Sequence, residues 1–331
     1  MSRPGKSTQS GSALLAVLWL SAALSAIAFT VATSVRAETE RTSTDVDALR
    51  TYYLATGAID RAMLYMEWGP LFRNPDGSSR YYAPPASFLN FQFASGDARV
   101  EIVPESAKLN INSARPEELM ALMLALGVDP ERAQAIVAGI VDWRSPSPAG
   151  AFTQFDQYYL SRPSSFQSRH ASFQEIEELL LIRGVTPDLF YGGFARNPDG
   201  KLVAHAALRD CVSAWGSLGP IDVNSAPPAV MQAIGISPSA VAGIVALRQN
   251  APIRTMDQLA AFRDSGPGVS RLGLQGNSYA TLRATARLRL SNGRMSDLQR
   301  SVSALVKFQG LDKTPRFVVM RWYDNAYTPA P

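Results

Sequence analysis

Residues 1–36 read MSRPGKSTQSGSALLAVLWLSAALSAIAFTVATSVR, and they decide the class of the protein. No charged side chain occurs from Ser7 to Val35, and the apolar stretch of about 13–32 is long enough to span a bilayer as a helix. A secretory signal peptide has a shorter apolar stretch, followed by small residues at its cleavage site. Here the small residue, Gly11, precedes the apolar stretch, so cleavage there would leave the helix on the mature chain. An uncleaved membrane anchor is the alternative.

The composition is that of a globular chain and excludes several classes of function. The 331 residues are enough for one large or two medium domains. The formal net charge is +4, and Arg3 and Lys6 in the leader contribute two of these units, so no nucleic-acid surface is expected. One cysteine and two histidines exclude an intramolecular disulfide and argue against zinc. The sequence has no glycine-rich phosphate loop, and it has no Ser, His and acidic residues arranged as a catalytic set. We therefore expect that the protein is not an enzyme.

The basic leader indicates how the chain is oriented in its membrane. Positively charged flanks stay on the cytoplasmic side, so the chain after Val35 is predicted to lie on the opposite side. In a bacterium this describes a single-pass protein of the inner membrane with its C-terminal domain in the periplasm.

The N-terminal helix is predicted to continue past the membrane to Trp68. Its second part has residues at steps of three or four that form a stripe: Val46, Leu49, Tyr53, Thr56, Ile59, Met63 and Met66. Gly69-Pro70 is a stop signal. Because the stripe needs an apolar partner, we expect this part of the helix to pack on a sheet of the same chain.

Alternating segments predict that sheet in two distant parts of the sequence. Residues 88–93 and 98–103 alternate on either side of a turn at 95–97, which indicates a hairpin. Residues 281–290, 299–308 and 317–322 form the second set. We expect both sets to belong to one antiparallel sheet.

The sequence between the two strand sets, 113–275, indicates a helical domain inserted into the sheet domain. It contains a weak repeat, since Leu109-Asn-Ile-Asn-Ser-Ala114 matches Ile221-Asp-Val-Asn-Ser-Ala226. The pattern Gly-apolar-x-Pro occurs three times, at 127–130, 184–187 and 235–238. In each case glycine ends one helix with a positive φ, and Asp, Thr or Ser caps the next helix ahead of its first residue, proline.

Several short motifs, taken in order, carry a resemblance to a known family. They are Gly11-Ser-Ala-Leu-Leu15, Lys108-Leu-Asn-Ile-Asn-Ser-Ala114, Asp142-Trp143, Tyr158-Tyr-Leu160, Phe173 to Leu181 with Arg183-Gly-Val-Thr-Pro187, and Ile221 to Pro228. In this order they resemble the K-type minor pseudopilins (GspK family) of the bacterial type II secretion system. The resemblance runs from the Gly11 junction to about Val319.

The resemblance implies an α+β fold in which a long N-terminal helix packs on an antiparallel pilin-like sheet. The implied parts are a prepilin leader (1–11), a transmembrane helix (12–35), the first part of the pilin-like domain (36–112), an inserted all-helical domain of helix-hairpin-helix or SAM-like type (113–275), and the C-terminal strands (276–331). Prepilin peptidase would cut between Gly11 and Ser12.

The function implied by the resemblance is that of a minor pseudopilin at the tip of the periplasmic pseudopilus. Such a subunit helps to initiate assembly and to export folded proteins across the outer membrane. The implied partners are the I- and J-type minor pseudopilins, the major pseudopilin, the prepilin peptidase and the inner-membrane secretion platform. No nucleic acid and no catalytic cofactor are implied.

Ala16 departs from the pattern of ordinary pilins and agrees with the K type. Most pilins carry glutamate as the fifth mature residue, and this carboxylate neutralises the N-terminal ammonium of a neighbour inside the filament. If cleavage follows Gly11, the fifth residue here is Ala16. A bare charge in an apolar core is costly, and a subunit at the end of a filament has no neighbour above it to neutralise.

Asp142 and Asp156 are the candidate metal ligands. The K-type family tends to be acid-rich after its Asp-Trp pair and can bind calcium there. Between residues 142 and 156 only these two carboxylates occur, whereas calcium takes six to eight oxygen ligands. Backbone carbonyls or Glu175 would have to supply the rest. The alternative is that no calcium binds and that Asp142 is a cap or surface carboxylate.

The main alternative function is DNA binding or uptake by a membrane-anchored helix-hairpin-helix protein. The Asn-Ile-Asn-Ser-Ala element also resembles that class, whose hairpins bind phosphates through glycine-rich turns and basic residues. The turns at 127–130 and 235–238 have one glycine each and little positive charge nearby, and Asp129 would repel a phosphate. We therefore favour protein contacts.

Overall fold

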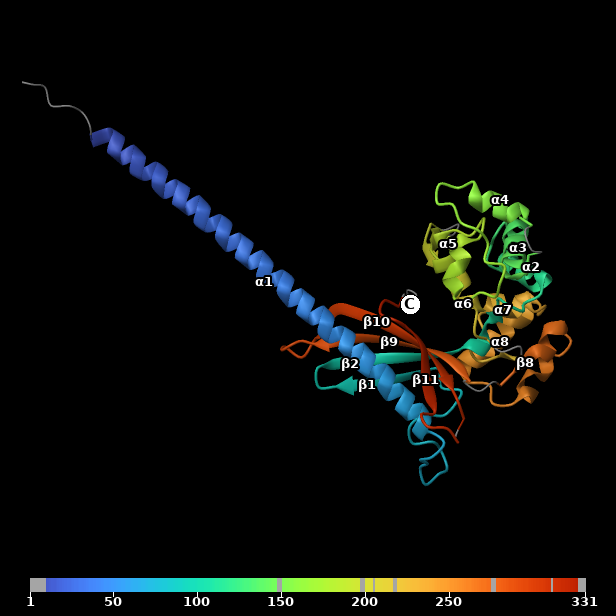
Figure 1. Cartoon of the computed structure of the whole chain (residues 1–331). Helices are drawn as coiled ribbons and strands as arrows, with labels where there is room; N and C mark the ends of the chain where they lie inside the picture. Colours follow the sequence, from blue (N-terminus) through green and yellow to red (C-terminus); the bar gives the residue numbers. More distant parts are fainter. Residues whose placement is uncertain are drawn as a thin grey trace, which may run out of the picture.

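The computed structural model describes residues 10–147, 151–196, 200–204, 206–216, 219–274, 278–310 and 312–326. Residues 1–9 of the predicted leader lie outside the described residues. The chain forms a long N-terminal helix, a sheet packed on the second half of that helix, and a lobe of short helices beyond the sheet (Figure 1). The α+β architecture predicted from the sequence is thus confirmed.

Helix α1 is continuous from Ser10 to Trp68 and ends at Gly69-Pro70, as the stop signal predicts. The predicted stripe was only partly right, because Val46, Leu49 and Tyr53 are exposed. Ile59 and Met66 of the predicted stripe are buried, and the rest of the buried face consists of Thr51, Leu54, Ala55, Ala58 and Ala62. Small alanine side chains allow α1 to lie close to the sheet, which is also rich in buried alanine.

The sheet has five strands in the order β1-β2-β9-β10-β11, and the pairings between neighbours are antiparallel. The strand bounds are Phe88–Phe93 (β1), Gly96–Pro104 (β2), Tyr279–Arg289 (β9), Met295–Phe308 (β10) and Phe317–Tyr323 (β11). The two strand sets therefore share one sheet, as predicted. Pro104 is the register partner of Ala280. In topology, the whole lobe is the loop of a β2–β9 hairpin.

The lobe contains seven α-helices among its described residues, besides the 3-10 helices at Ile176–Leu181, Met256–Phe262 and Pro267–Arg271. The α-helices are α2 (Pro116–Ala125), α3 (Pro130–Arg144), α4 (Gln154–Leu160), α5 (Pro187–Tyr191), α6 (Leu208–Cys211), α7 (Pro228–Ala233) and α8 (Pro238–Asn250). Asp129, Thr186 and Ser237 cap α3, α5 and α8 with their side chains, and Gly127, Gly184 and Gly235 have positive φ. The physical account of the Gly-apolar-x-Pro pattern holds at all three positions.

The expectation of an all-helical insertion that starts at residue 113 needs correction. Short strands pair in parallel, β3 (Leu109–Asn110) with β6 (Val212–Ser213) and β7 (Ile221–Asp222) with β8 (Leu272–Gly273). Strands β4 (Phe194–Arg196) and β5 (Leu202–Ala204) form an antiparallel pair. The buried side chains of Leu109 and Ile111 belong to the core of the lobe. An extended backbone that enters a core needs partners for its N–H and C=O groups, and the paired strands supply them.

The weak sequence repeat corresponds to two copies of one structural module. Asn112 binds both backbone groups of Phe173: its Oδ1 accepts from the Phe173 N–H at 2.7 Å, and its Nδ2 donates to the Phe173 carbonyl at 3.0 Å. Asn224 binds Ile253 in the same way, at 2.8 and 2.9 Å. The repeated asparagine thus fastens a distant strand-like segment in each module.

Besides these asparagine contacts, an arginine contact is repeated in the two modules. The Arg144 guanidinium donates to the carbonyls of Ile111 and Ala114, each at 2.7 Å. Arg248 donates to the carbonyls of Val223 and Ala226, each at 2.8 Å. Each arginine comes from the last turn of its module's second long helix, so it holds the Asn-Ser-Ala turn onto that helix.

Replacing Asn112 with alanine should destabilise the lobe by about 2–3 kcal/mol, because two backbone groups of Phe173 lose their partners in a buried setting. Asn224→Ala should have a similar effect through Ile253. Asn90→Ala, at an exposed position of β1, is the matched control and should change stability by less than about 0.5 kcal/mol. Chemical denaturation of the three variants measures these differences. If Asn112→Ala and the control were equally stable, the hydrogen bonds from Asn112 to Phe173 would not stabilise the lobe.

Candidate functional site

The first part of α1 presents a long apolar surface. From Ser12 to Val46 every side chain is exposed, and the large apolar ones are Leu14, Leu15, Val17, Leu18, Trp19, Leu20, Leu24, Ile27, Phe29, Val31 and Val35. Thr30 and Thr33 donate their hydroxyl hydrogens to carbonyls one turn back, at 2.8 and 3.0 Å. Polar groups satisfied within the helix suit a lipid environment. This segment fits a single-pass anchor by length and composition.

The predicted processing residues lie at the start of this helix. The backbone of Gly11 belongs to α1, and Ser12 follows it in the same turn. Ala16 is one turn further along and is exposed, so the position carries only a methyl group. The cut between Gly11 and Ser12 stays a prediction, as does the role of the missing carboxylate.

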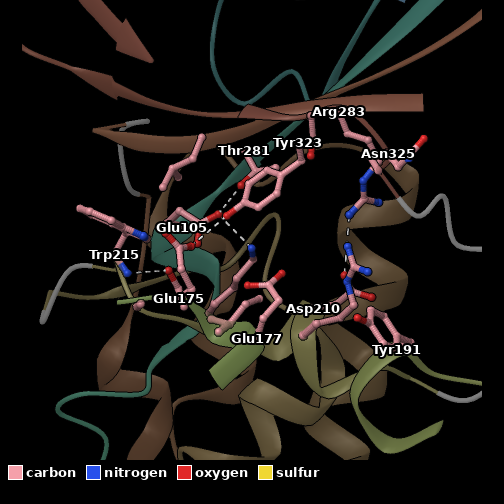
Figure 2. Close-up of a pocket in the computed structure, with 18 residues that line it drawn as sticks. Glu105, Glu175, Glu177, Tyr191, Asp210, Trp215, Thr281, Arg283, Tyr323 and Asn325 are labelled. Atoms are coloured by element: carbon pink, nitrogen blue, oxygen red, sulfur yellow. Dashed lines mark hydrogen bonds and ion pairs between the residues drawn. The ribbon is translucent and has the colours of Figure 1, made fainter. Parts of the chain in front are cut away.

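Sequence reasoning missed a polar junction between the sheet and the lobe (Figure 2). At its centre lies Glu105, which is buried. Lys108 Nζ lies 2.9 Å from Glu105 Oε1, and Thr281 Oγ1 donates to the same oxygen at 2.7 Å. Burial would raise the pKa of the Glu105 carboxyl, but Lys108 and hydrogen bonds from Ser213 and Thr281 outweigh it and hold that pKa below its usual range. Glu105 is therefore an ionised anchor where β2 passes into the lobe.

Three further contacts fasten the lobe to the sheet. Glu175 of the lobe pairs with Arg321 of β11 and accepts a hydrogen bond from the Tyr323 hydroxyl at 3.1 Å. Arg283 of β9 lies 3.7 Å from Asp210. Burial, followed by the nearby Glu175 charge, raises the pKa of Tyr323. These partners are far apart in sequence, and no local motif could have indicated them.

The junction encloses a cavity of about 180 Å³. Its lining includes both acidic and basic side chains, and Figure 2 labels Glu175, Glu177, Asp210 and Arg283 among them. Across the part of the chain that the structure describes, no group of three or more His, Cys, Asp or Glu side chains could hold a metal ion. Two ion pairs lie within this lining, Glu105 with Lys108 and Asp210 with Arg283, and the second of them links the lobe to the sheet.

The structure brings the two candidate calcium ligands together around Ser168. The Ser168 hydroxyl lies 3.2 Å from Asp142 Oδ2, and the Ser168 N–H donates to Asp156 Oδ1 at 3.0 Å. Asp156 is fully buried and also accepts from the Thr153 N–H and contacts His170 Nε2 at 2.9 Å. Burial would raise the pKa of the Asp156 carboxyl, but these hydrogen bonds outweigh it and hold the pKa below its usual range.

This donor set does not fit a calcium ion, because the oxygens of Asp156 are already occupied by protein donors. Glu175, the further donor that the sequence suggested, is engaged at the junction with Arg321 and Tyr323. Residues 148–150, in the same loop, lie outside the described residues. Calcium binding stays a prediction, and the described contacts give Asp156 a structural task instead.

The two hairpin turns weighed for DNA binding do not offer a phosphate cradle. At the first turn the Asp129 carboxylate accepts from the N–H groups of Glu131 and Arg132, at 3.1 and 3.3 Å. Those amides are the ones a phosphate would need at a helix N-terminus. At the second turn, Pro267 and Gly268 lie against Gly235. Both turns therefore serve the packing of the lobe.

Comparisons with known proteins agree with this architecture. A family model described as "Type II secretion system (T2SS), protein K" matches residues 99–191, which run from β2 to the end of α5. A search of curated proteins gave no match.

Among solved structures, a chain of the crystal structure of the GspK-GspI-GspJ complex from the enterotoxigenic Escherichia coli type 2 secretion system matches with a TM-score of 0.55. The sequences are 16% identical, and the match covers 85% of this chain and 98% of that chain. At 16% identity the structural match shows a similar fold. The family itself is indicated by the family model that matches residues 99–191. The family-model match and the similar fold both support a GspK-type minor pseudopilin of the type II secretion system.

Proposed function

We propose that this minor pseudopilin is anchored in the bacterial inner membrane by α1, with its sheet and lobe in the periplasm, and that it forms the tip of the pseudopilus. Its direct partners there would be I- and J-type minor pseudopilins, as the similar structure is described as a complex of GspK with GspI and GspJ. The major pseudopilin would follow below, and the prepilin peptidase and the inner-membrane platform would act before and during assembly.

The observation that carries the proposal is the place of the lobe. It is inserted at one end of the sheet, between β2 and β9, and it lies far from the apolar half of α1 (Figure 1). Helices of stacked subunits would run alongside α1, and the lobe would then occupy the space of a subunit placed above. A subunit that blocks addition above itself suits a filament end.

The protein would act by shape and contact, without chemistry of its own. Its junction contacts hold the lobe in a fixed orientation, and a rigid lobe blocks stacking better than a mobile one. By nucleating the filament, the subunit would help to export folded proteins across the outer membrane.

Labelling the native filament tests this position. Gold particles against a tag in the exposed turn 291–294 should mark one end of each pseudopilus, whereas particles against the major pseudopilin should mark its whole length. The turn projects from the β9–β10 hairpin and is exposed, so the tag should not disturb the sheet. Particles spaced along the shaft would overturn the tip proposal.

A further inference from the structure

An open apolar groove runs between α2 and α3 in the first module of the lobe, and α4 forms one wall. Its volume is about 1010 Å³. It is lined by Pro116, Glu117, Met120, Ala121, Leu124, Gln134, Val137, Ala138, Val141, Asp142, Ser145, Thr153, Gln154 and Phe155. We refer to it as the α2–α3 groove.

One wall of the α2–α3 groove, formed by Thr153, Gln154 and Phe155, comes from a segment that the second module lacks. In the second module the chain passes from the clamping Arg248 to Ile253 within residues 249–252. In the first module, residues 145–172 intervene between Arg144 and Phe173 and include α4. Ser168 links this wall to α3, because its N–H donates to Asp156 of α4 at 3.0 Å and its hydroxyl donates to Asp142 of α3 at 3.2 Å.

The α2–α3 groove combines an apolar floor with charged lining residues that are all acidic. Its floor is apolar and comes from two neighbouring helices, with Met120 and Leu124 on α2 and Val137 and Val141 on α3. The small side chains of Ala121 and Ala138 leave room between them. The charged lining residues are both acidic, Glu117 and Asp142, and the lining set contains no Lys, Arg or His.

We propose that the α2–α3 groove binds an amphipathic helix of another protein, with an apolar stripe toward the floor and Lys or Arg beside Glu117 and Asp142. A groove between two helices receives side chains at i, i+3, i+4 and i+7 of an added helix, and the acidic rim selects a basic flank. This inference stands apart from the tip proposal, because it rests on the groove alone.

The same observations disfavour other occupants. A small molecule would need converging polar groups in an enclosed pocket, whereas the floor is apolar and the groove is open. An anionic lipid headgroup would be repelled by Glu117 and Asp142. A second copy of the chain offers its exposed α1 segment, but residues 12–35 carry no basic side chain.

The test uses the full chain in phosphatidylcholine nanodiscs and a fluorescent helical peptide of about 14 residues, with leucine at i, i+3, i+4 and i+7 and lysine on its flanks. Fluorescence anisotropy should give a micromolar Kd, after subtraction of binding to empty nanodiscs. Ala138→Trp should weaken binding at least tenfold, because Ala138 is exposed in the groove and tryptophan would fill it.

A matched pair of variants tests whether the acidic lining residues contribute to binding of the basic peptide. Glu117 and Glu131 are the second residues of α2 and α3, each after proline, and both are exposed. Only Glu117 lines the groove. Glu117→Lys should weaken binding about threefold to tenfold at low salt, and Glu131→Lys less than twofold. Unchanged melting temperatures would show that all variants fold.

Three outcomes would overturn the proposal. One is equal affinity for a peptide with glutamate in place of lysine, and another is unchanged affinity in Ala138→Trp. The third is that the peptide fails to bind while the chain self-associates through a contact that Ala138→Trp removes, because the occupant is then a second copy.

Discussion

Replacing Gly11 with valine should leave the chain at its full length and abolish secretion. In the predicted processing, the peptidase would act at the cytoplasmic membrane face, where the leader meets the apolar helix, at a site that would accept almost no Cβ. A β-branched side chain there would crowd the scissile bond. N-terminal sequencing and intact mass should show a mature chain that begins at Ser12 in the native protein and an uncleaved chain in the variant.

The same helix supplies a matched control for this variant. Gly57 also lies within α1, and a Cβ added there would meet nothing within 4 Å. Gly57→Val should therefore be processed and function normally. A native protein that keeps residues 1–11, or that is cut after Ala37 in the manner of a secreted protein, would contradict the prepilin assignment.

Removing the lobe should turn the proposed tip subunit into a candidate shaft subunit once a carboxylate is added. Because Pro104 and Ala280 are opposite each other on β2 and β9, residues 105–279 can be replaced by Asn-Gly, the preferred two-residue hairpin turn. The sheet and α1 would remain. The truncated chain alone should enter filaments poorly, since Ala16 still offers no partner to a neighbouring ammonium.

Adding Ala16→Glu to the truncated chain should raise its incorporation along the shaft several-fold, because an ion pair inside an apolar core replaces a bare charge. Counting gold particles per unit length of filament measures this. Ala16→Gln in the same background keeps the shape without the charge and should not restore incorporation. In the full-length chain Ala16→Glu should change little, and a full-length variant spread along the shaft would show that the lobe does not block stacking.

The sequence was most informative where local physics decides the structure. Gly69-Pro70 fixes the end of α1, and alternation of apolar and polar residues identifies strands such as β1 and β2. The Gly-apolar-x-Pro pattern fixes helix ends because it combines a glycine with positive φ, a capping side chain and a proline. Each of these signals acts within a few residues, so one sequence is enough to read it.

The structure adds what depends on distant neighbours. Which face of α1 is buried depends on the close approach that Ala55, Ala58 and Ala62 permit, and the larger Val46 and Leu49 were misleading. The contacts of Glu105 and Glu175 at the junction depend on the fold of the whole lobe. The repeated Asn112 and Asn224 were visible as a motif, but their shared task needed the position of Phe173 and Ile253.

The candidate metal site shows the same limit in another form. The fold brings Asp142 and Asp156 together, and Ser168 lies between them. Yet His170 and Thr153 already satisfy Asp156. A sequence shows which carboxylates are present. Only the fold shows whether their oxygens already accept hydrogen bonds from other groups of the protein.

The hairpin that carries the lobe also sets an order of folding. The pairing of β2 with β9 closes a loop that begins after Pro104 and ends before Ala280, and an unstructured loop of that length costs about 4–5 kcal/mol of chain entropy. A lobe that is already folded holds its two ends together and removes most of this cost. The pairing of β2 with β9 is therefore a late, non-local step of folding. The sheet domain can be completed only after the lobe inserted into it has folded.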